Sequence, residues 1–91
     1  MPAPFITAVL DLLPSGGLSP ETGCQILGDA IAPAVGVGTP SGLLRRLKRY
    51  FTRQLEALQS QAADRASVET ALTRVFELAA AHDYQALSEL K

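Results

Sequence analysis

Apolar residues recur at steps of three and four between positions 44 and 62, which is the spacing of one face of an α-helix. The stripe consists of Leu44, Leu47, Phe51, Leu55, Leu58 and Ala62, widened on one side by Leu43 and Tyr50. Thr39 is a typical N-cap residue, and Pro40 fits the first helical position, where its missing N–H costs nothing. We therefore predict one long amphipathic helix over about 40–62, around which the rest of the chain is organised.

Two shorter helices are predicted before the long one. The first covers 4–13 and is closed by the sequence Pro-Ser-Gly-Gly. The second opens with Ser19 as its N-cap and ends near Ala32, because Pro33 disfavours a helical conformation of the residue before it. A helix that continues past this proline to Val35 is the alternative.

The C-terminal half has neither glycine nor proline after Gly42, so it can form one continuous helix or a hairpin of two. Its apolar stripe changes phase by about one residue after Ala62, which corresponds to a rotation of ~100°. Beyond that point the stripe is centred on Val68, Leu72, Val75 and Ala79. We predict a break between 62 and 67, capped by Asp64 or Ser67, and a separate helix over 67–81. One unbroken helix is the alternative.

A last short helix completes the predicted elements, with Asp83 as its cap and Tyr84, Leu87 and Leu90 on one face. No strand is predicted, because the β-branched cluster at 34–37 is bracketed by proline and glycines. The predicted fold class is all-α, a small bundle of four to five helices built around the long amphipathic helix at about 40–62. We expect the chain to form a single helical domain over 1–91.

Composition adds an expectation about partners and location. The 91 residues are 47% hydrophobic and 19% charged, which for so short a chain predicts apolar surface left over for a homo-oligomeric interface. Cys24 is the single cysteine, so no intrachain disulfide can form and a reducing, cytoplasmic location is favoured. The N-terminal segment lacks a basic region and a long apolar run, so neither a signal peptide nor a transmembrane segment is predicted.

Charge is distributed unevenly along the chain. The formal net charge is −1 and the pI is about 5.7, which argues against a general nucleic-acid binder. Residues 1–43 contain three acidic residues and no basic one, 44–53 contain five basic residues and no acidic one, and 54–91 contain six acidic and three basic residues. A basic band therefore lies between two acidic segments, which suits either fold-back of acidic groups onto it or contact between subunits.

The basic band forms the face of the long helix opposite the apolar stripe. We call it the basic face; it consists of Arg45, Arg46, Lys48, Arg49 and Arg53. Several of these residues are three or four positions apart, and each such like-charge pair costs about 0.2 to 0.5 kcal/mol, together about 1 to 2 kcal/mol. Two interpretations stay open, namely a solvated outer face and a site that binds a partner or an anion.

Residues for catalysis or metal binding are sparse. The one histidine, His82, is 58 positions from Cys24, and we expect it to interact with the carbonyls at a helix end. The chain has no CxxC, no HxxxH and no carboxylate pair at i, i+4. The glycine-containing segment 36–42 matches no phosphate-binding motif and is interpreted as an interhelix turn. We expect no enzymatic activity, no cofactor and no metal.

Together these features predict a non-enzymatic protein-protein interaction or assembly module, such as an adaptor, that associates with itself and presents the basic face to an acidic partner. The alternative is a helix-turn-helix-like DNA-binding regulator that uses Arg45 to Arg53, although its connecting segment is longer than usual. Attachment to a membrane surface would require the apolar stripe to be exposed.

Overall fold

The computed structural model describes residues 4–35 and 42–90, which form five helices and no strand. The helices are α1 (Pro4–Leu12), α2 (Pro20–Val35), α3 (Leu43–Gln59), α4 (Arg65–Ala80) and α5 (Tyr84–Ser88). The predicted fold class, a small all-α bundle built around one amphipathic helix, is confirmed.

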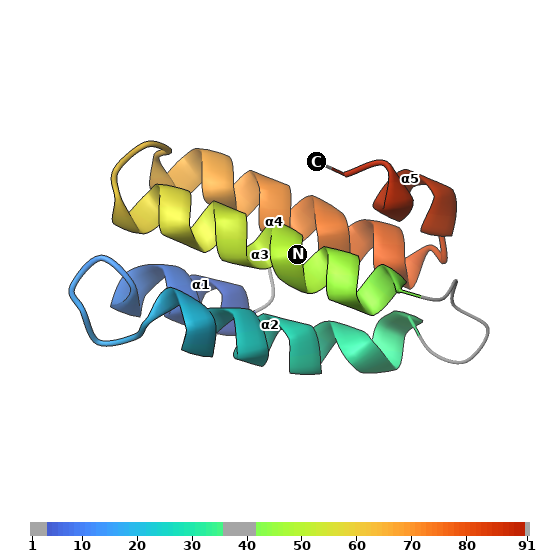
Figure 1. The fold of residues 1–91 in the computed structure, drawn as a ribbon, viewed down its shortest axis with the longest axis horizontal. Helices are drawn as coiled ribbons and strands as arrows, with labels where there is room; N and C mark the ends of the chain where they lie inside the picture. Colours follow the sequence, from blue (N-terminus) through green and yellow to red (C-terminus); the bar gives the residue numbers. More distant parts are fainter. Residues whose placement is uncertain (1–3, 36–41, 91) are drawn as a thin grey trace.

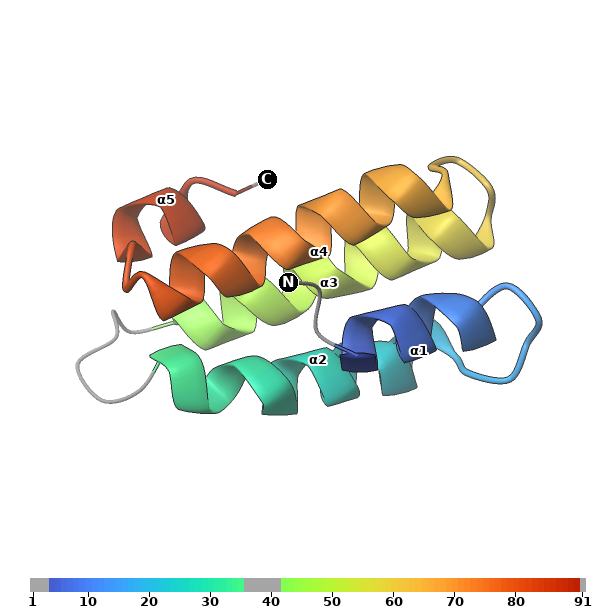
Figure 2. The ribbon, with the colours of Figure 1, turned by 180° about the vertical axis from the view of Figure 1, so that it is seen from behind.

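Helix α3 occupies the centre of the bundle. It lies beside α2 on one side and α4 on the other, and α5 contacts both α3 and α4 (Figure 1). Seen from behind, α1 packs against α2 and α4 (Figure 2). Because three helices contact α3, only one of its faces is left to solvent.

The apolar face of α3 is the middle of the hydrophobic core. Its buried residues are Leu43, Leu47, Tyr50, Phe51, Leu55 and Leu58. Phe51 is fully buried, and its ring stacks on Phe76 of α4 with 6.0 Å between the ring centroids. The predicted stripe is therefore shifted toward Leu43 and Tyr50, which are buried, whereas Leu44 is half-buried and Ala62 is exposed in the turn after the helix.

Both ends of α3 differ from the predicted range of about 40–62. The helix begins at Leu43, because Gly42 has a left-handed conformation with φ of 83°, and it ends at Gln59. Gln61 also has a positive φ, 65°, which turns the chain toward α4. The expected cap and first helical residue, Thr39 and Pro40, lie outside the described residues, as does most of the glycine-containing segment 36–42.

The predicted break after α3 is present, so the alternative of one unbroken helix is wrong. Asp64, and not Ser67, is the N-cap of α4, and the backbone N–H of Ser67 donates to Asp64 Oδ1 at 2.9 Å. The helix therefore starts at Arg65, two residues earlier than predicted. Hydrogen bonds from the Ser67 side chain and backbone lower the pKa of the Asp64 carboxyl. Asp83 caps α5 in the same way, through the N–H of Ala86.

Helix α2 continues past the predicted end at Ala32 and includes Pro33. A proline this close to a helix C-terminus removes one backbone donor without interrupting a long ladder of hydrogen bonds. The extension places Val35 in the core, 4% exposed, and this burial offsets part of the cost of the proline. The N-terminus is as predicted, since Ser19 Oγ accepts from the N–H of Thr22 at 3.2 Å.

Two buried glycines of α2 let neighbouring side chains approach its backbone. A Cβ added at Gly23 would lie 2.8 Å from Leu55 Cδ1 and 3.2 Å from Val9 Cγ1, both in the core. A Cβ at Gly28 would instead lie 2.9 Å from Cε of Lys48, near the free end of an exposed side chain. The two positions therefore differ in how easily the neighbour can move.

We expect Gly23→Ala to lower the free energy of unfolding, because overpacking at about 1 to 3 kcal/mol exceeds the gain of about 1 kcal/mol in helix propensity. Gly28→Ala is the matched control and should leave stability unchanged or slightly raised, since Lys48 can move away. Urea denaturation of both variants measures this difference. Equal effects at the two glycines would contradict the packing described here.

Candidate functional site: a basic groove on α3

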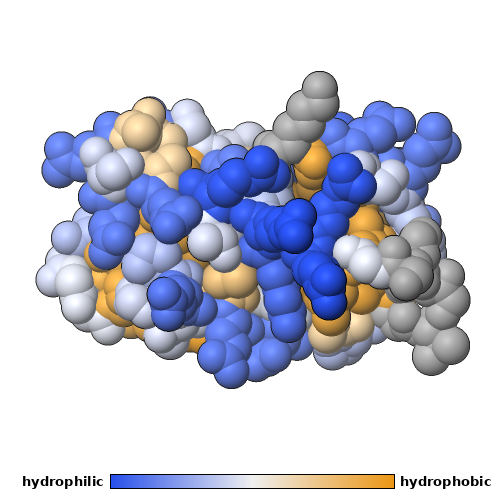
Figure 3. All heavy atoms as spheres, in the orientation of Figure 1, coloured by the Kyte–Doolittle hydropathy of each residue, from blue (hydrophilic) through white to orange (hydrophobic). Residues whose placement is uncertain are grey.

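The basic face lies on the solvent-exposed side of α3. Between Leu43 and Arg53 the exposed positions are Arg45, Arg46, Lys48, Arg49 and Arg53, so every exposed position in this part of the helix carries a positive charge. The core determines this arrangement, because the buried positions of α3 take up the other side of the helix. Strongly hydrophilic side chains accordingly gather in the middle of this face of the molecule (Figure 3).

These side chains surround a hollow of about 700 Å³. We call it the basic groove; its lining residues are Arg45, Arg46, Lys48, Arg49, Thr52, Arg53 and Leu90. The volume falls in the range of about 300 to 1,000 Å³ that is usual for ligand sites. All but one of these residues belong to α3, and Leu90 follows α5 in the chain.

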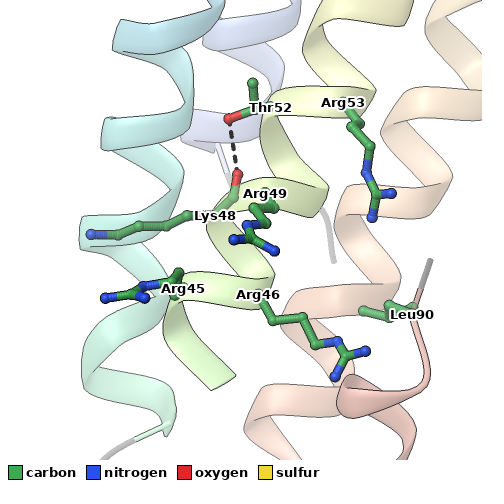
Figure 4. Close-up of a pocket in the computed structure, with 7 residues that line it drawn as sticks. All are labelled: Arg45, Arg46, Lys48, Arg49, Thr52, Arg53 and Leu90. Carbon is green, nitrogen blue, oxygen red and sulfur yellow. Dashed lines mark hydrogen bonds between the residues drawn. The ribbon is translucent and has the colours of Figure 1, made fainter. Parts of the chain in front are cut away.

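The cations point in different directions across α3. Arg45 and Lys48 extend toward α2, whereas Arg46 and Arg53 extend toward α4 and α5, with Arg49 between the two pairs (Figure 4). The aliphatic part of Lys48 lies over Gly28 of α2, as shown by the short distances from Cγ and Cε to a Cβ placed there. Positive charge therefore covers the full width of the exposed face.

No acidic group of the described residues neutralises this charge. Within 4–35 and 42–90 the ion pairs are those of Arg65 with Asp11 and with Glu69, and both are remote from the basic groove. The fold-back of acidic segments onto the basic face, which the charge distribution allowed, is not found among these residues. The groove thus presents five positive charges that are free to pair with an external anion.

Because α3 begins later than predicted, the cations of the basic face lie closer to its N-terminus, and their electrostatic cost is higher. With Leu43 as the first helical residue, Arg45 and Arg46 lie in or next to the first turn, where the helix dipole disfavours cations by about 0.3 to 1 kcal/mol each. The N-cap, Gly42, has no side chain to bind the free amides. A bound anion in this region would offset the unfavourable interaction of the cations with the helix dipole and would reduce the like-charge repulsion.

Helix α5 holds Leu90 at the edge of the groove. Leu87 of α5 is fully buried, and the Tyr84 hydroxyl donates to the carbonyl of Val35 at 2.8 Å, which links α5 to the end of α2. The same hydroxyl lies 2.9 Å from Nδ1 of His82, which acts as the donor because the hydroxyl proton is already used. Leu90 is partly buried and packs against the core, with its remaining surface on the groove.

Sequence reasoning identified the five cations of the groove but not Leu90 or Thr52. Leu90 was expected on the face of the last helix, but α5 ends at Ser88 and Leu90 lies beyond it. No local sequence pattern indicates that this residue comes next to α3, because the contact depends on how α5 folds back. Thr52 Oγ1 donates to the backbone carbonyl of Lys48 at 2.9 Å, an ordinary use of threonine inside a helix.

The two residues that could support catalysis, Cys24 and His82, contact different parts of the structure and not each other. Cys24 Sγ lies 3.1 Å from the backbone oxygen of Lys48, whereas the ring of His82 contacts Tyr84. Among the described residues no three His, Cys, Asp or Glu side chains come together in a way that could hold a metal ion. A second hollow, on the outer face of α4, is smaller at about 420 Å³ and carries charges of both signs, including Arg74 and Glu77.

None of the helices in 4–35 and 42–90 is long and apolar enough to cross a membrane. Comparison with known protein families, with characterised protein sequences and with solved structures finds no match to this chain. What the structure itself defines is a small all-α bundle with a basic groove on its central helix.

Removing one charge from the basic face should stabilise the protein. Arg49 has like-charged neighbours at Arg45, Arg46 and Arg53, so Arg49→Gln should raise the free energy of unfolding at low ionic strength by about 0.5 to 1.5 kcal/mol. The control is Arg74→Gln, which removes an exposed arginine with no such neighbours and should leave stability unchanged or slightly lower. Urea denaturation of both variants measures the effect. Loss of stability in Arg49→Gln would mean that the fold itself requires this arginine.

The hydroxyl of Tyr84 should matter for the position of α5. Tyr84→Phe removes its hydrogen bond to Val35 and should lower the free energy of unfolding by about 0.5 to 1.5 kcal/mol. Faster hydrogen exchange of the α5 amides should accompany this loss. Tyr50→Phe is the matched control, because the Tyr50 hydroxyl has no hydrogen-bond partner among the described residues. Identical exchange in both variants would exclude a role for Tyr84 in holding α5.

Proposed function

We propose that this chain is a non-enzymatic protein-interaction module whose basic groove binds an acidic segment of a partner protein. The observation that carries the proposal is the set of five exposed cations on α3, which have no acidic partner among the described residues and surround a hollow of about 700 Å³. Charges so arranged favour binding of an anion and accelerate the encounter with an acidic partner.

The shape of the site favours a peptide over duplex DNA. A recognition helix has to project from its domain in order to enter the major groove, which is about 12 Å wide. Here α3 lies between α2 on one side and α4 and α5 on the other (Figure 1), and the cations line the hollow of the basic groove. The net charge of −1 also differs from the overall basic excess that is usual for a nucleic-acid-binding domain. A DNA-binding regulator is therefore the alternative, and the experiment has to distinguish it from a protein that binds acidic peptides.

Self-association is a weaker part of this proposal. Of the large hydrophobic side chains whose burial the structure describes, in 6–35 and 42–90, Leu12 and Ile26 are the exposed ones, at 47% and 37%. An obligate dimer interface usually has a larger apolar area. We accordingly propose a separate acidic protein as the main partner, with a second copy of the chain as an additional one. The mass of the protein in solution tests the second part directly.

The docking proposal is tested with two labelled probes, a short oligoglutamate peptide and a DNA duplex, in fluorescence anisotropy titrations at low ionic strength. The wild-type protein should bind the peptide more tightly than the duplex. Reversal of two central charges, Arg46→Glu with Arg49→Glu, should weaken peptide binding by about tenfold or more.

Arg74→Glu provides the matched control, because it reverses an exposed arginine outside the basic groove and should leave peptide affinity within about twofold. Peptide binding that is unaffected by the double reversal would overturn the proposed site. Tighter binding of the duplex, lost in the same double variant, would instead support the DNA-binding alternative.

A further inference from the structure

The basic groove is not lined by charge alone. Leu90 forms its apolar part, and this side chain keeps some exposed surface although it packs against the core. In the close-up view it reaches toward α3 from the C-terminal segment, on the side to which Arg46 and Arg53 extend (Figure 4). The groove therefore offers a ligand one apolar contact beside guanidinium groups that have no acidic partner among the described residues.

The apolar surface lies on one side of the groove only. Positive charge extends across the whole width, from Arg45 and Lys48 at the α2 edge to Arg46 and Arg53 on the side of α4 and α5, and Leu90 lies on this second side. A ligand that fills the groove therefore needs acidic groups over α3 and an apolar group beside them, at the end close to Leu90.

This combination distinguishes between anionic ligands. Guanidinium groups bind both carboxylates and phosphates in the bidentate geometry, so the cations alone do not distinguish a peptide from a nucleic-acid backbone. A phosphodiester backbone, however, has no apolar side chain that would cover Leu90. A peptide offers both kinds of group, and burial of apolar surface on Leu90 would add to its affinity.

We infer that the groove recognises an acidic amphipathic peptide, in which one aliphatic or aromatic side chain packs against Leu90 while neighbouring carboxylates pair with Arg46, Arg49 and Arg53. This inference rests on the function proposed above and adds the sequence character of the partner. The bidentate hydrogen bonds of the arginines would fix the orientation of the peptide. Contact with Leu90 would favour peptides that have an apolar residue at the facing position.

The test compares two peptides of equal charge, oligoglutamates with either leucine or serine at one central position, titrated against wild-type protein by fluorescence anisotropy. The leucine peptide should bind about fivefold more tightly, because its side chain is partly buried on Leu90. Leu90→Ala should abolish this preference, and Leu90→Met, which keeps an apolar side chain, should retain it. Circular dichroism identifies variants that keep the helical fold.

The outcomes separate the inference about Leu90 from the proposed docking of acidic segments. Equal affinity for the leucine and serine peptides in the wild type would overturn the inference about Leu90 while leaving docking of acidic segments in place. This comparison requires no variant, so unfolding of Leu90→Ala would not obscure it. A preference for leucine that persists in a folded Leu90→Ala protein would also overturn the inference. Binding of a DNA duplex with no binding of either peptide would overturn both proposals.

Discussion

Burial of the apolar face of α3 against three other helices is the constraint on which the rest of the structure depends. Leu47, Phe51 and Leu55 are fully buried, so the rotation of the helix about its axis is fixed. This rotation determines which positions of the helix face solvent. In the first part of the helix, each exposed position is an arginine or lysine. Rotation of the helix cannot disperse these charges, because burial of an unpaired guanidinium group costs several kcal/mol.

Packing of the core therefore keeps mutually repelling positive side chains together on the surface of α3. Like-charge neighbours on α3 cost about 1 to 2 kcal/mol together, a noticeable part of a typical domain stability of about 5 to 15 kcal/mol. The nearby helix N-terminus adds to this cost for Arg45 and Arg46. Such local destabilisation is characteristic of sites where a ligand supplies the missing opposite charge, and it is the physical reason for proposing a binding function for this face.

Much of this structure could be predicted because its determinants are local. Helix spacing identified α3 and its basic face, and short-range side-chain caps at Ser19, Asp64 and Asp83 marked three helix starts. The start of α3 was misplaced because the left-handed conformation of Gly42 produces no periodic signal.

The remaining differences depend on tertiary contacts. Helix α2 continues past Pro33 while Ile31 and Val35, on either side of it, are buried in the core, a contact that propensity alone does not reveal. Leu90 was missed as part of the groove for a related reason: the segment that carries it is positioned by the hydrogen bond from Tyr84 to Val35, 49 residues apart in the chain. The cations of the candidate site could thus be predicted from sequence, whereas its apolar edge could not.

The dependence of wild-type stability on ionic strength tests the central claim most directly. Urea unfolding is followed as salt shortens the Debye length from about 30 Å at ~0.01 M to about 8 Å at ~0.15 M. The ion pairs of Arg65 are exposed and contribute little to stability. The salt dependence of the free energy of unfolding should therefore be dominated by repulsion within the basic face. The account predicts that the free energy of unfolding rises by about 1 kcal/mol as the repulsion is screened. Stability that is constant or falls over this range would contradict it.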